Sequence, residues 1–71
     1  MKEITIQDIL TNREIAIALS IWRKNDMPAR EICEKVIKPN MARIDTKLGQ
    51  ENDPMYLSYM VEHVFNCTEK R

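Results

Sequence analysis

Glycine is almost absent from this chain: Gly49 is the only one among 71 residues. Beyond residues 4–6, the sequence also lacks the alternation of apolar and polar residues that is typical of half-buried strands. Sheets and glycine-rich turns are therefore not expected. Apolar residues recur instead at helical spacing. This pattern predicts an all-α fold, a small bundle of three main helices plus a short N-terminal helix over residues 6–10.

Cysteine is scarce as well, and the wide separation of Cys33 and Cys67 matches neither a CxxC pair nor a metal-ligand spacing. We expect buried, reduced thiols rather than a disulfide. A secretory signal and an apolar run long enough to span a bilayer are also missing. These absences predict a cytoplasmic protein that makes no contact with membranes.

No charge of either sign predominates, because 11 lysines and arginines balance 11 aspartates and glutamates. This balance excludes the strong long-range attraction to a phosphate backbone that most nucleic-acid-binding domains have. The whole chain, residues 1–71, is expected to form one helical domain, since it has no material for a second core. A single core of this size supplies only about 3–5 kcal/mol of stability, so we expect self-association as a homodimer.

Capping residues predict a helix over residues 12–24. Thr11 followed by Glu14 fits a capping box, in which each residue satisfies a backbone N–H group of the other. Cationic side chains at the far end complement the helix dipole. One apolar stripe is formed by Ile15, Ala18, Leu19 and Trp22, and a second row by Ile17 and Ile21. This helix is therefore expected to be buried on two sides, with a second copy or a partner on one of them.

Pro39 leaves two alternatives for residues 28–48. Inside a helix, proline removes the hydrogen bond to the carbonyl of Lys35 and clashes with that group. The apolar positions nevertheless keep helical spacing across it: Cys33, Ile37, Met41, Ile44 and Leu48. We predict one long helix kinked at Pro39, the alternative being a turn over residues 38–40. Gly49 suits the cap that ends this helix, and Pro54 predicts the start of a last helix over residues 54–67.

The predicted helices carry more apolar width than a small bundle can cover, so part of it is expected to contact another protein. Aromatic and methionine side chains are favoured at the centres of interfaces. The candidate partner-binding residues are Trp22, Met41, Tyr56, Tyr59, Met60 and Phe65. For each of them, the alternative is a place in the core. We predict a non-catalytic protein-interaction module, a regulatory protein such as an accessory subunit or inhibitor of a larger protein or complex.

Nucleic-acid binding by a helix-turn-helix over residues 29–48 is the alternative function. Its recognition helix would carry Asn40, Arg43 and Lys47, and residues 23–47 hold seven basic and four acidic side chains. The fit is poor, because bulky Ile37 stands where the turn favours glycine and Arg43 where a core aliphatic belongs. We therefore expect nucleic acid to be the less favoured partner.

Neither catalysis nor a bound cofactor is expected. No nucleophile stands beside a base at a recognisable spacing, and the chain has a single histidine. His63 and Cys67 are one helical turn apart, which would allow both to bind one ion. Two ligands are too few unless Cys33 or Glu62 completes the set. We therefore predict no catalytic residues and no metal site.

Overall fold

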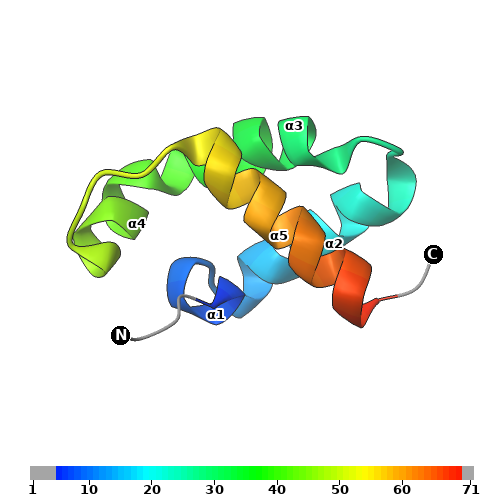
Figure 1. Cartoon of the computed structure of the whole chain (residues 1–71), viewed down its shortest axis with the longest axis horizontal. Helices are drawn as coiled ribbons and strands as arrows, with labels where there is room; N and C mark the ends of the chain where they lie inside the picture. The colour runs from blue at the N-terminus through cyan, green and yellow to red at the C-terminus, as the bar shows by residue number, and fades with distance from the viewer. Residues whose placement is uncertain (1–4, 70–71) are drawn as a thin grey trace.

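The computed structural model describes residues 5–69, which fold as an all-α bundle with no strand among them (Figure 1). This confirms the predicted fold class of three main helices and a short N-terminal one. The elements are α1 (Ile6–Ile9), α2 (Asn12–Lys24), α3 (Pro28–Ile32), a π-helical turn (Cys33–Ile37), a 3-10 turn (Lys38–Asn40), α4 (Met41–Leu48) and α5 (Pro54–Thr68). No helix in this described range is both long and apolar enough to cross a membrane.

Helix α2 begins and ends where the sequence predicts. The hydroxyl oxygen of Thr11 accepts a hydrogen bond from the backbone N–H of Glu14 at 3.2 Å, and the Glu14 carboxylate accepts from the Thr11 N–H at 2.9 Å. At α1, the N–H of Thr5 donates to the carboxylate of Asp8 at 2.9 Å. Both helices are thus started by local side-chain contacts, which sequence reasoning can identify.

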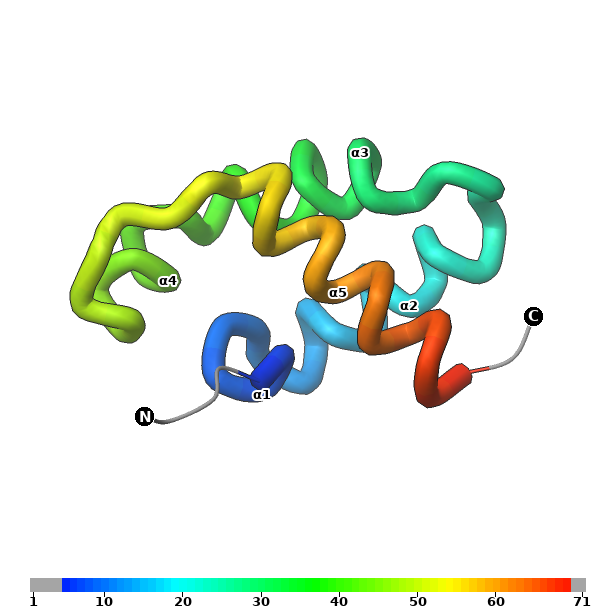
Figure 2. Tube along the Cα trace, viewed as in Figure 1, coloured from blue at the N-terminus to red at the C-terminus, as the bar shows by residue number. Residues whose placement is uncertain are grey.

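The helical segments from Pro28 to Leu48 follow one another without a break, so the prediction of one long helix that passes through a kink at Pro39 is confirmed. The chain passes Pro39 by widening into the π-helical turn and then tightening into the 3-10 turn. Proline has no N–H to give to the preceding turn. Next to Pro39, the side-chain amide of Asn40 donates to the carbonyl of Val36 at 2.7 Å, one turn earlier in the helix. In Figure 2, α3 and α4 follow one another along one edge of the molecule.

Gly49 ends the middle helix in the left-handed conformation, with φ of 73°. Its N–H and that of Gln50 both donate to the carbonyl of Asp45, at 2.8 and 3.2 Å. The chain then reverses through a polar connector, in which the Asn52 amide donates to the Asp45 carboxylate at 2.9 Å. Asp53 caps α5 by accepting from the N–H of Met55 at 2.9 Å. Helix α5 runs one residue beyond the predicted range.

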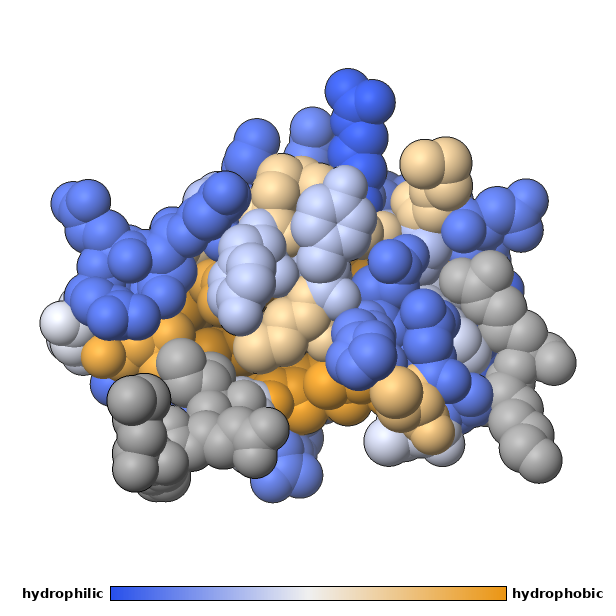
Figure 3. All heavy atoms as spheres, in the orientation of Figure 1, coloured by the Kyte–Doolittle hydropathy of each residue, from blue (hydrophilic) through white to orange (hydrophobic). Residues whose placement is uncertain are grey.

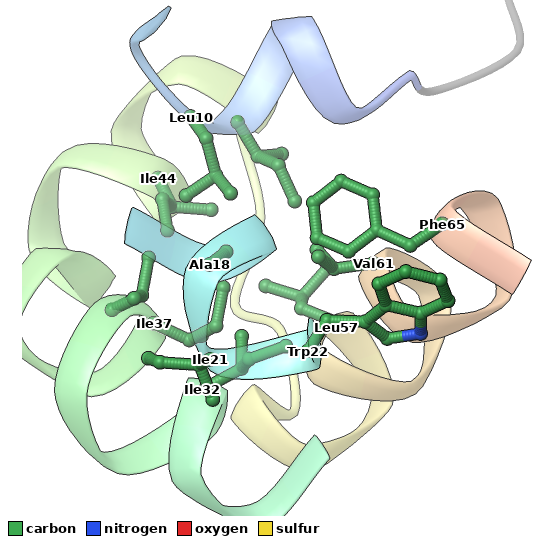
Figure 4. Close-up of a cluster of buried hydrophobic side chains, with 12 residues drawn as sticks. Leu10, Ala18, Ile21, Trp22, Ile32, Ile37, Ile44, Leu57, Val61 and Phe65 are labelled. Carbon is green, nitrogen blue, oxygen red and sulfur yellow. The ribbon is translucent and has the colours of Figure 1, made fainter. Parts of the chain in front are cut away.

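The core lies where α5 crosses α2 and packs against α3 and the π-helical turn (Figure 1). Each helix contributes the side chains at its inward positions, and α1 closes one end through Ile9 and Leu10. Figure 4 shows the cluster, whose buried members are Ile9, Leu10, Ala18, Ile21, Trp22, Ile32, Val36, Ile37, Ile44, Leu57, Val61 and Phe65. The chain therefore forms a complete small core from its own residues.

Candidate protein-binding face

Two of the predicted partner-binding residues, Trp22 and Phe65, are core residues. They are 2% and 4% exposed, and their rings meet edge to face with centroids 6.0 Å apart (Figure 4). The indole N–H of Trp22 donates to the side-chain oxygen of Asn66 at 2.9 Å, which satisfies the polar end of the buried ring. Trp22 and Phe65 therefore occupy the core position that the sequence left as the alternative, because the packing of α2 against α5 buries both in the monomer.

Met41 and Met60 are intermediate cases. Both are half-buried and pack against the edge of the core. Met41 lies on α4 and Met60 on α5, and neither is among the exposed large apolar side chains of the described residues. Each can offer only the part of its side chain that the core leaves uncovered.

Tyr56 and Tyr59 lie on the surface, at 66% and 57% exposed. They are three residues apart on α5 and so share one side of the helix, while Leu57 and Val61 occupy the buried side. The prediction that they are surface residues agrees with these positions. Figure 3 views this side of the molecule, where side chains of intermediate and apolar hydropathy gather over α5 between hydrophilic ones.

Met27 extends this apolar surface at the corner between α2 and α3, where it is 84% exposed. We call the set Met27, Met55, Tyr56 and Tyr59 the Tyr–Met face. An open groove of about 450 Å³ runs through it, and its lining residues are Asp26, Met27, Ala29, Arg30, Met55, Tyr59 and Glu62. The groove has apolar walls and charged groups of both signs, a composition suited to contact with another protein.

Sequence reasoning missed Met27 and Met55 as residues of the groove. Met27 belongs to no apolar stripe, because it occupies the capping position before Pro28 and its side chain makes no cap hydrogen bond. An apolar side chain at a capping position has no neighbours in the helix to cover it. This position could have identified Met27 as exposed from the sequence. Met55 stands in the first turn of α5, before the buried stripe begins at Leu57.

Two of the three residues of the nucleic-acid alternative, Asn40 and Arg43, make contacts within the chain. The guanidinium of Arg43 donates to both carboxylate oxygens of Glu14, at 2.9 and 2.5 Å, and to the carbonyl of Ile9 at 3.1 Å. The side-chain amide of Asn40 donates to the Val36 carbonyl. Of the three candidate residues, Lys47 alone is exposed and has no described contact. The helix continues through residues 37–39, so the turn that a helix-turn-helix requires is not formed there.

Arg43 and Glu14 tie α4 to the start of α2. The hydrogen bonds from Arg43 hold the pKa of the Glu14 carboxyl below its ordinary value, against a smaller opposing effect of burial. The same pair raises the pKa of Arg43. The carboxylate of Glu14 also accepts the capping-box hydrogen bond at the start of α2. The same carboxylate therefore stabilises the end of its own helix and the contact of α2 with α4.

The two cysteines differ in their surroundings. Both are free thiols, which agrees with the expectation that they form no disulfide. Cys33 is buried, as expected, whereas Cys67 is exposed, so its predicted burial is wrong. Cys67 stands in the last turn of α5.

The buried polar side chain of α5 is satisfied. Ser58 lies in the core and donates to the carbonyl of Pro54 at 2.7 Å. Among residues 5–69, no buried side-chain nitrogen or oxygen is left without a partner.

The chain matches no protein-family model, no curated protein and no solved structure. The Tyr–Met face is therefore the site defined by the geometry of this chain alone.

Proposed function

We propose that this chain is a small, non-catalytic protein-interaction module of the regulatory or accessory type, and that it self-associates through the Tyr–Met face. The observation that carries the proposal is the exposure of Tyr59 and Met27 at one groove, with Tyr56 exposed three residues before Tyr59 on α5. A chain whose core is already complete has no structural use for these three side chains on its surface. Tyrosine and methionine are the residue types enriched at the centres of protein interfaces.

A second copy is the occupant that the charges of the groove favour. In a twofold interface the same patch meets itself, so each patch must contain both members of every complementary pair. The groove holds Arg30 on one wall and Glu62 on the other, together with the apolar Met27 and Tyr59. Two copies can therefore pair Arg30 with the other copy's Glu62 while burying their apolar side chains.

Light scattering on a gel-filtration column tests this proposal directly. The purified chain is expected to elute as a dimer whose population rises with concentration, and Tyr59→Asp is expected to make it a monomer. Burying an unpaired carboxylate in an interface costs several kcal/mol. Because Tyr59 is 57% exposed in the monomer, the helical circular dichroism of the variant is expected to stay unchanged.

Ala42→Asp is the matched control, since it adds the same charge at an exposed position of α4 that does not line the groove. It is expected to dimerise like the parent chain. A parent chain that stays monomeric at every concentration would refute self-association. Loss of the dimer in Ala42→Asp but not in Tyr59→Asp would place the interface elsewhere. Tyr56→Asp provides an independent second variant on the same face.

A further inference from the structure

The last helix carries a pair of metal-ligand residues that the Tyr–Met face does not use. His63 and Cys67 lie one turn apart on α5, and both are exposed. The Nε2 atom of His63 is 3.6 Å from the Sγ atom of Cys67. The pair lies along the outer side of the helix that also holds Tyr59, which is one turn before His63.

This separation is the one that a tetrahedral zinc ion requires. Zinc binds sulfur at about 2.3 Å and imidazole nitrogen at about 2.0–2.1 Å. With an angle of about 109° between the two bonds, the sulfur and the nitrogen are about 3.6 Å apart. The two side chains are therefore already placed as neighbouring ligands on one zinc ion, without a change of backbone or helix register.

One chain supplies only half of a closed zinc site. Within residues 5–69, no three His, Cys, Asp or Glu side chains are grouped to hold a metal ion. Neither Cys33, which is buried, nor Glu62 completes the set, as the sequence would have required. A second copy of the chain would supply the two missing ligands, its own His63 and Cys67. Two thiolates then balance the double positive charge of the ion, and two imidazoles complete the four-coordinate set that structural zinc sites favour.

We propose that a zinc ion binds between two copies of this chain, held by His63 and Cys67 of each. On binding, each Cys67 thiol loses its proton to solvent, so two Zn–S bonds form, two S–H bonds break and two protons are released. Each His63 binds through its unprotonated Nε2 atom. The site is isologous, because the same two residues serve in both copies. It lies on the same helix as the Tyr–Met face but does not require that face.

Cobalt substitution and metal counting test the proposal, with a non-thiol reductant present to exclude a disulfide between Cys67 residues. The zinc-loaded protein is expected to hold one metal ion per two chains and to elute as a dimer. Cobalt is expected to give the absorption bands of a tetrahedral, thiolate-bound ion. Cys67→Ser is expected to abolish the sulfur-to-cobalt band. In the Tyr56→Asp background, His63→Ala is expected to abolish zinc-dependent dimer formation. Helicity is expected to be retained, because positions 63 and 67 are both exposed.

Two further variants separate this proposal from the proposed function. Cys33→Ala removes the other thiol and is expected to leave the cobalt spectrum intact. Tyr56→Asp disables the Tyr–Met face and is expected to be a monomer without metal and a dimer with zinc. Tyr59→Asp is unsuitable here, because a carboxylate one turn from His63 is itself a ligand. One metal ion per chain, a cobalt band that survives Cys67→Ser, or no metal binding would overturn the zinc site.

Discussion

The middle helix and α5 both carry residues that the sequence marks as candidates for contact with a partner. The fold pairs such a residue on the middle helix and leaves others exposed on α5. On the middle helix, Arg43 is taken up by Glu14 and a backbone carbonyl, and so closes the junction between α2 and α4. On the outer side of α5, Tyr56 and Tyr59 are exposed, and Tyr59 lines the groove. This difference shows that residue type alone does not decide whether a side chain is free to contact another molecule. A partner 29 residues away converts a candidate recognition arginine into a structural one.

The largest expected effect comes from a change in the core. Phe65→Ala should destabilise the chain by about 3–5 kcal/mol, because it removes a buried ring and leaves a cavity beside Trp22. A domain of this size has little more stability than that to lose. Urea denaturation followed by circular dichroism measures the loss.

Tyr56→Ala is the matched control for Phe65→Ala on the same helix. It removes an aromatic ring from an exposed position and is expected to change the free energy of unfolding of the monomer by less than about 0.5 kcal/mol. Equal losses in the two variants, both measured on the monomer, would contradict the assignment of Phe65 to the core and Tyr56 to the face.

A smaller effect is expected at the closed junction. Arg43→Ala should lower the free energy of unfolding by about 1–2 kcal/mol, because it removes charge-assisted hydrogen bonds to Glu14 and to the Ile9 carbonyl. Arg23 provides the comparison, since its contact with Glu69 is longer, at 3.5 Å, and more exposed. Arg23→Ala should cost no more than about 0.5 kcal/mol. If Arg43→Ala instead abolished DNA binding without destabilising the fold, the junction would have to be reinterpreted as a recognition surface.

The smallest expected effect is a dependence of stability on pH. The pKa of Glu14 is lower in the folded chain than its ordinary value of 4.5, chiefly because of the hydrogen bonds from Arg43. The unfolded state therefore binds this proton more readily, and the stabilisation is fully present above about pH 4.5. It is lost as the pH falls through the pKa of the folded state. Unfolding curves measured from pH 6 to pH 3 should show a shallower decline in Arg43→Ala than in the parent chain.

Local features of the fold could be predicted from the sequence. Both ends of α2, its capping box, the left-handed Gly49 and the continuity of the middle helix each depend on residues within one or two turns. The spacing of Ile37, Met41 and Ile44 also indicated that Pro39 does not change the inward face of the helix. These interactions are short in sequence, and the pattern alone determines them.

The long-range features could not be predicted in this way. Trp22 and Phe65 were assigned to an interface because nothing in either stretch shows that α2 and α5 pack together, and Trp22 meets Asn66 across 44 positions of the chain. The groove beside Met27 likewise exists only where the start of α3 meets α5. Of the candidate site, the exposed tyrosines were predicted, whereas the groove and its methionines required the tertiary structure.

The passage of the chain around Pro39 has a consequence for how the middle helix encodes its core. The wide turn at Cys33–Ile37 under-winds the backbone and the tight turn at Lys38–Asn40 over-winds it, so their deviations from α-helical twist have opposite sign. The apolar pattern therefore keeps its phase across a break in the hydrogen-bond ladder. The side chains of this segment therefore follow the pattern of one helix, although the backbone hydrogen bonds change their pattern at Pro39.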